Sequence, residues 1–144
     1  MNQSQASAFS RAVDLPQTMP AALLRGVKGK CPRCGEAKLF RAYLKPIDAC
    51  PACGQDWTPQ CADDFPAYIS ILVSGHLMAP VIVALVLAPA LPAWLAGAII
   101  VAVALVLTVS LLQPAKGAVI AGQWWLGMHG FAADPGREQA KAED

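Results

Sequence analysis

The chain has 144 residues, a formal net charge of +1, and a hydrophobic fraction of 56%. This length allows one domain, or one small module with a membrane anchor, and excludes a large soluble core beside such an anchor. The near-neutral charge gives no support for bulk electrostatic attraction to nucleic acid. However, residues 65–115 contain no Asp, Glu, Lys or Arg, which is typical of a double crossing of a lipid bilayer.

The N-terminal part is predicted to be a polar, disordered tail over residues 1–22, followed by a zinc ribbon over residues 23–60. Residues 38–44 have the composition of a short strand or hairpin arm within that ribbon. The proline and glycine of each CPxCG motif bend the backbone so that amide groups face the sulfurs, and two such turns together give tetrahedral coordination. The two motifs, spaced as C-x2-C-x15-C-x2-C, supply Cys31, Cys34, Cys50 and Cys53.

A closed site of four thiolates favours structural zinc, because no coordination position stays open for a substrate. A ribbon this small cannot bury enough surface to fold unaided, so the metal is expected to supply on the order of 10 kcal/mol of its stability. Two alternatives remain open: iron in the same site, and disulfide exchange or copper transfer by the Cys-x-x-Cys pairs. The fifth cysteine, Cys61, is expected to be a free thiol outside the site.

Basic residues surround the cysteine motifs, and we expect them to balance the negative charge of four thiolates on one divalent ion. The alternative is that this face docks an acidic protein, anionic headgroups or RNA. Only Phe40 and Tyr43 are interleaved with the charges, so nucleic-acid stacking has little support. The basic residues are Arg25, Lys28, Lys30, Arg33, Lys38, Arg41 and Lys45.

A two-helix transmembrane hairpin is predicted for residues 66–112. Its first span covers residues 67–87 and its second residues 93–112, with a proline-containing turn between them. At 1.5 Å per residue, each span is long enough to cross a hydrocarbon core of about 30 Å. The predicted fold class is therefore a small zinc ribbon followed by an all-α two-helix transmembrane hairpin.

The orientation of the hairpin follows from the distribution of Lys and Arg. The turn contains none, whereas eight basic residues precede the hairpin and Lys116 follows it directly. Both termini are therefore expected to face the cytoplasm. The nearest basic residue before the first span is Lys45, about twenty positions away. A reducing cytoplasm also keeps zinc thiols from pairing as disulfides.

Within the first span, His76 and Pro80 form a candidate polar site. His76 carries an ionisable imidazole, and ionisable groups inside membranes are frequently functional. Pro80 lacks the N–H that would otherwise bond the carbonyl of His76 four residues earlier. This helix level could bind a partner helix, a water, a haem or a copper ion. The alternative is that neutral His76 donates to a carbonyl or to Ser or Thr on the neighbouring helix, and that Pro80 only kinks the span.

Residues 113–131 are predicted to form an interfacial juxtamembrane segment, and residues 132–144 a second polar tail. Paired tryptophans near a basic residue suit the headgroup layer at the cytoplasmic end of a span. The residues assigned to this layer are Lys116, Gln123, Trp124 and Trp125.

Short motifs follow one another along the chain in a recognisable order: Leu23-Leu24-Arg25-Gly26, CPRCG, Leu39-Phe40-Arg41, CPACG, Gly75-His76 with Pro80, Pro114-x-Lys116-Gly117 and Gln123-Trp124. In this order they resemble one bacterial family, domain of unknown function 983. The resemblance covers about residues 22–125 and implies a multi-pass protein of the bacterial inner membrane with a predicted zinc ribbon. It also implies a neighbourhood of genes for haem-copper cytochrome oxidase, and hence oxidase subunits or assembly factors as partners. Two places depart from the family pattern: Gln113, where arginine is expected, and the entry to the first helix at residues 61–65.

The function expected from these features is a non-enzymatic, membrane-anchored interaction or assembly module, accessory to cytochrome oxidase biogenesis in the respiratory chain. The first alternative is handling of copper, haem or electrons through the Cys-x-x-Cys pairs and His76. The second is a membrane-tethered contact with RNA or the ribosome, supported by the basic residues alone. No nucleophile, base and orienting group fall in a recognisable pattern, so an enzyme is not predicted.

Overall fold

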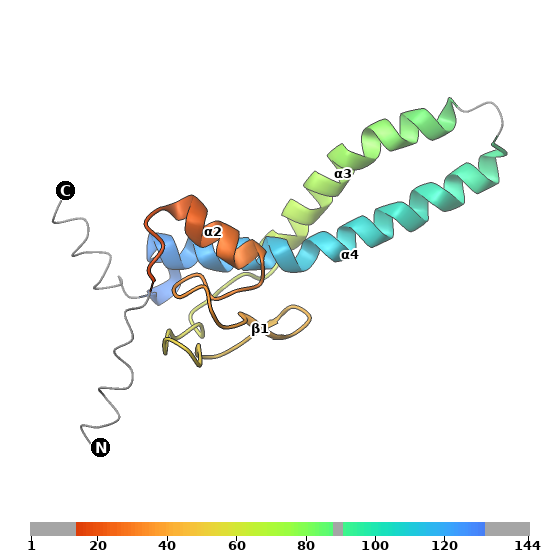
Figure 1. Ribbon diagram of the computed structural model, residues 1–144. Coiled ribbons are helices and arrows are strands. Elements are labelled where there is room, and N and C mark those ends of the chain that lie inside the picture. Colours follow the sequence, from red (N-terminus) through yellow and green to blue (C-terminus); the bar gives the residue numbers. More distant parts are fainter. Residues whose placement is uncertain (1–13, 88–90, 132–144) are drawn as a thin grey trace, which may run out of the picture.

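The computed structural model describes residues 14–87 and 91–131. Figure 1 shows a compact part, which holds the short elements and the end of α4, and an arm formed by the two long helices. The arm consists of apolar helices, and the compact part contains the cysteines. The elements in chain order are α2 (Met19–Val27), β1 (Phe40–Ala42), β2 (Lys45–Pro46), α3 (Phe65–Val86), α4 (Ala93–Leu126) and the 3-10 turn η1 (Met128–Gly130).

Helix α2 begins inside the segment predicted to be a tail. The hydroxyl of Thr18 accepts a hydrogen bond from the amide of Ala21 at 3.4 Å, and Pro20 occupies the first turn, so the helix start is capped. The predicted tail of residues 1–22 is therefore corrected at its C-terminal end. Residues 1–13 and the second predicted tail, 132–144, lie outside the described residues.

The two CPxCG motifs adopt the same turn. Gly35 and Gly54 each have φ of +70°, and their amides donate to the carbonyls of Cys31 and Cys50 at 2.8 Å. A side chain is strained at this φ, which explains the glycine that ends each motif. Between the motifs, β1 pairs with β2 in an antiparallel hairpin, as the strand-like composition predicted. We call residues 29–62 the cysteine module.

Helices α3 and α4 contain 22 and 34 residues, and both are long and apolar enough to cross a membrane. The second was predicted to end at residue 112, but α4 continues to Leu126 as one helix. Pro114 removes one backbone hydrogen bond, yet packing of the following turns outweighs this loss. The buried residues of that second half are Ala115, Gly117, Ile120, Ala121, Gln123 and Trp124.

Small polar residues join α3 to α4. Ser70 and Ser74 are buried, and the hydroxyl of Thr108 donates to that of Ser74 at 3.3 Å. Small side chains at Ser70 and Ser74 allow α4 to approach α3 closely here. Ala98 and Ala102, also small residues at helical spacing on α4, are exposed.

Helix α2 crosses the second half of α4 at two glycines. A Cβ added to Gly26 would lie 2.3 Å from the carbonyl oxygen of Gly117, and one added to Gly117 would lie 2.0 Å from that of Gly26. Only glycine at both positions permits this backbone contact. Two of the family-like motifs, one in α2 and one in α4, therefore meet in space.

The main core lies where the cysteine module, α2 and the end of α4 come together. Its largest member is Trp57, which is fully buried and makes edge contacts with Trp124 and Phe131, with ring centroids 6.0 and 5.8 Å away. Nearby, the backbone of Cys61 and the side chain of Gln123 exchange two hydrogen bonds. The cysteine module and α4 thus share one core.

Candidate metal centre

The four cysteines of the two motifs converge on one point. Their Sγ atoms all lie within 4.8 Å of one another, and all four residues are buried. The Cys31–Cys53 and Cys34–Cys50 sulfur pairs are each 3.8 Å apart. Four sulfurs placed tetrahedrally about 2.3 Å from a central ion would be separated by about 3.8 Å. The donor set and its spacing fit a four-thiolate metal centre.

Backbone amides face the sulfurs of the first motif. Burial strongly raises the pKa of the Cys31 thiol, although a hydrogen bond from the amide of Cys34 acts in the opposite direction. Burial also raises the pKa of Cys34, but amide hydrogen bonds from Ala37 and Glu36 contribute to a net lowering. A cation held between the sulfurs would favour the thiolate form of both residues.

The second motif is tied to nearby arginines. Burial raises the pKa of Cys53, while the amide of Gln55 and the side chain of Arg33 oppose the rise. Arg33 also donates to the carbonyl of Cys53 at 3.2 Å. Arg25 donates to the carbonyl of Arg33 at 3.0 Å and forms an ion pair with Asp14 at 3.0 Å. These two arginines therefore brace the cysteine turns.

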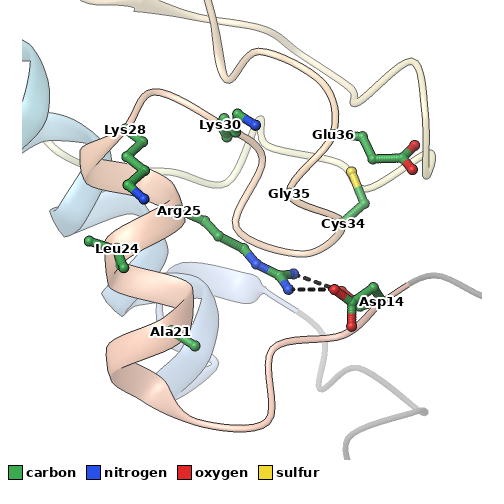
Figure 2. A pocket seen from close by; sticks show the side chains of 9 residues that line it. All are labelled: Asp14, Ala21, Leu24, Arg25, Lys28, Lys30, Cys34, Gly35 and Glu36. Atoms are coloured by element: carbon green, nitrogen blue, oxygen red, sulfur yellow. Dashed lines mark hydrogen bonds and ion pairs between the residues drawn. The ribbon is translucent and has the colours of Figure 1, made fainter.

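A pocket of about 460 Å³ opens beside the first motif, between α2 and the Cys34 turn (Figure 2). In that view the Arg25 side chain reaches from α2 toward Asp14. Cys34 is the one residue of the cysteine set that lines it, so solvent approaches the centre from this side. The lining residues are Asp14, Ala21, Leu24, Arg25, Lys28, Lys30, Cys34, Gly35 and Glu36.

His76 and Pro80 lie on the exposed side of α3, away from this centre. His76 is two residues from Ser74, hence about 200° around the helix from the side that contacts α4. Its Nδ1 lies 2.7 Å from the carbonyl oxygen of Leu72 on its own helix. A carbonyl only accepts, so Nδ1 carries the proton. The hydrogen bond that the structure gives His76 therefore goes to a carbonyl of its own helix and not to Ser or Thr of α4.

Within residues 14–87 and 91–131, the four cysteines are the sole group of three or more His, Cys, Asp or Glu residues close enough to hold a metal ion. His76 does not join them. Cys61 is also separate, and its thiol donates to a carboxylate oxygen of Asp63 at 3.1 Å. This hydrogen bond raises the pKa of the exposed Cys61 thiol.

The residues predicted to lie in the headgroup layer have different surroundings. Trp124 is 2% exposed and Gln123 is 7% exposed, so both belong to the core that α4 shares with the cysteine module. This placement corrects their interfacial assignment; a tryptophan pair has the same pattern in a core and at a bilayer surface. Trp125 contacts Trp124 edge-on, and Lys116 is half-buried in the same half of α4.

Trp57 was missed by the sequence analysis, although it organises this core. The available signal was its position four residues after Cys53, where a large apolar residue can cover the back of a small module. Its indole N–H has no hydrogen-bond partner among the described residues. Its role in the core is therefore apolar packing.

Together, these features define a class of protein in which a four-cysteine module packs on the end of a hairpin of two long apolar helices. The chain belongs to the family described as "Protein of unknown function (DUF983)", whose model matches residues 40–124. This confirms the resemblance noted from the motifs, although the match begins after Cys31 and Cys34. No curated protein and no solved structure shows significant similarity to the chain.

Proposed function

We propose that the chain is a membrane-anchored zinc-ribbon protein that acts as an interaction or assembly module, without catalytic activity of its own. The observation that supports this most is the shared core. Trp57 of the cysteine module is buried against Trp124 of α4, so a metal bound by the cysteines would stabilise the base of the helical arm. The metal would then fix the surface of the cysteine module that contacts a partner.

Zinc is the proposed metal, in a structural role. The buried four-sulfur set leaves no coordination position for a substrate. The module has only a few short strands and a small apolar core, so it depends on the metal for its folding. Iron fits the same sulfurs, and the metal analysis described below separates the two.

The membrane assignment draws on the exposure of the long helices. Only 17% of the most apolar window of α3 and 6% of that of α4 is buried, whereas a core helix of a soluble protein would be mostly covered. A bilayer is the proposed partner for these surfaces. The proposed location is the bacterial inner membrane, with both ends of the hairpin facing the cytoplasm.

The partner we propose is another membrane protein. In the respiratory version of this proposal, the partner is a subunit or an assembly factor of cytochrome oxidase. The test is deletion of the gene, followed by complementation with the wild-type chain or with Cys31→Ser. Loss of assembled oxidase, restored by the wild type alone, would support this version. Normal oxidase content and respiration under every growth condition would reject it.

The biochemical test uses the full chain purified in lipid nanodiscs. We expect one zinc per chain, colourless and resistant to a chelator, in the wild type and in the control Cys61→Ser. The Cys31→Ser variant should lose the metal. A red, iron-containing centre would overturn the structural-zinc assignment.

A second candidate function is metal transfer, because Cys34 lines the open pocket and could meet an incoming ligand there. Transfer requires exchange, so zinc should leave for a thiol chelator within minutes and copper should enter. Retention of zinc for hours would exclude this candidate.

A further inference from the structure

The turn of the β1–β2 hairpin touches the arm of the molecule. Tyr43, at this turn, donates a hydrogen bond from its hydroxyl to the backbone carbonyl of Val109 in α4. Figure 1 shows the hairpin beneath α4, near the place where the two long helices come together to begin the arm. The hairpin therefore reaches along α4 toward the apolar segment.

The depth of this contact follows from the length of α4 and rests on the proposed membrane anchoring. Helix α4 begins at Ala93, and Val109 lies about 24 Å further along at 1.5 Å per residue. A hydrocarbon core of about 30 Å that begins at Ala93 would extend only about one turn beyond Val109, and would end before Ala115, where burial by protein begins. The ring of Tyr43 thus reaches into the membrane boundary from the cytoplasmic side.

The residues beside Tyr43 carry positive charge. Arg41 and Lys45 are exposed on the two strands of the hairpin. The Arg41 side chain is 61% exposed, and its ion pair with Asp48 is long, at 3.8 Å. Both cations therefore remain available to solvent or to anions. An aromatic ring at the boundary with cations on either side is typical of chains that lie on anionic membranes.

The fold places Lys45 closer to the arm than its position in the sequence suggests. Lys45 is about twenty residues from the first span in sequence, too far to count as a juxtamembrane charge. The Tyr43–Val109 hydrogen bond brings this lysine to the level where α4 leaves the apolar region. Lys116 lies seven residues after Val109, hence on the same side of α4. The three cations thus belong to one end of the arm.

We propose that the β1–β2 turn is a membrane-surface contact that binds anionic phospholipid headgroups, with Tyr43 at the acyl boundary and Arg41 and Lys45 on the phosphates. Inorganic phosphate is a poorer fit as the ligand, because it has no acyl chains for Tyr43 to contact. RNA is disfavoured because the one aromatic ring of the turn is already held against α4.

The lipid-binding test uses the full chain in neutral detergent micelles, with a fluorescent phosphatidylglycerol as the probe. We expect Arg41→Gln/Lys45→Gln to weaken binding about 25-fold, since one basic residue near an anionic surface contributes about fivefold. The control Lys28→Gln/Lys38→Gln has the same net charge and should stay within about twofold of wild type. Zinc content verifies that each variant is folded.

Several outcomes would overturn the proposal. Equally weakened lipid binding in both double variants would show that binding depends on net charge alone. Displacement of the lipid by millimolar inorganic phosphate would indicate a phosphate site, and binding of an RNA oligonucleotide that depends on Arg41 and Lys45 would indicate an RNA surface.

A second measurement separates this proposal from membrane anchoring. Spin labels are placed at Ala42 or at Val101, each in a Cys61→Ser background, and their access to oxygen and to a water-soluble nickel complex is compared in nanodiscs. Val101, exposed on α4, should be inside the bilayer if the arm spans it. Ala42 should be at the headgroup level. A buried Val101 label with a fully aqueous Ala42 label would reject the lipid contact and leave the anchor intact.

Discussion

Replacing Gly117 with alanine tests the backbone contact between α2 and α4. The new Cβ would lie 2.0 Å from the carbonyl oxygen of Gly26 and 2.7 Å from its carbonyl carbon. Ordinary contact starts at 3.4 Å, so the helices would have to separate by about 1.4 Å. Both obstacles are helical backbone, which cannot rotate away as a side chain could.

The expected cost can be bounded. Forcing extra volume into a packed region costs about 1–3 kcal/mol, whereas alanine is about 1 kcal/mol more favourable than glycine within a helix. The displacement at Gly117 involves rigid backbone on both sides, so we place the overpacking term at its upper end. The net result is a free energy of unfolding lower by about 2 kcal/mol.

Gly122→Ala is the matched control on the same helix. Its Cβ would lie 3.7 Å from a side-chain methyl of Leu23, an ordinary contact, so the variant should be neutral or more stable by up to about 1 kcal/mol. The assay is denaturant unfolding of the full chain in detergent, followed by tryptophan fluorescence and metal release. If Gly117→Ala unfolds at the same denaturant concentration as Gly122→Ala, the reasoning is wrong.

Three further predictions concern the metal centre and its surroundings. Cys31→Ser should lose stoichiometric metal and unfold the cysteine module, whereas Cys61→Ser should keep both the metal and the folded module. Metal analysis and circular dichroism measure the two properties. Metal retained by Cys31→Ser would contradict the four-thiolate centre. Trp57→Ala should lower the free energy of unfolding by about 3–5 kcal/mol in denaturant unfolding, because it leaves a cavity against α4. The control Trp94→Ala, at an exposed position, should have little effect. Equal effects of the two substitutions would refute the shared core. Asp63→Asn should make alkylation of Cys61 severalfold faster near pH 8. The hydrogen bond to Asp63 raises the pKa of the Cys61 thiol and so lowers its thiolate fraction at that pH. An unchanged pH profile of the alkylation rate would exclude this hydrogen bond.

The cluster of four cysteines was predictable because its signal is local. Each CPxCG motif specifies its own turn, and the second copy at Cys50 and Cys53 indicates that two turns share one ion. The apolar helices were equally clear, since a long stretch without charge is a property of consecutive residues. These features require no knowledge of how distant segments meet.

The contacts that join the parts were not predictable, because they link residues far apart in sequence. In the sequence, nothing distinguishes Gly26 and Gly117 from glycines of loops. Their role becomes evident only when α2 and α4 are placed against each other. Tyr43 and Val109 are 66 positions apart, and neither shows a local sign of the pairing. Such partners are chosen by the whole fold.

The end of α4 was misplaced for a related reason. Pro114 and Lys116 follow the apolar stretch, and a proline before a basic residue is typical of the end of a span. The helix nevertheless continues to Leu126, because α2 and the cysteine module cover its next turns. Hydropathy reports where the apolar surface ends and carries no information about a helix that continues within a protein core.

The distance in sequence between Gly26 and Gly117 delays their contact during biosynthesis. Chains emerge at about 5–20 residues per second, so the α4 glycine is made about 5–20 s after its α2 partner. All four clustered cysteines precede both long helices in the chain. The candidate metal centre is therefore synthesised complete before the arm. Trp57 then stays uncovered until Trp124 is made, so the nascent chain exposes this apolar surface for that interval.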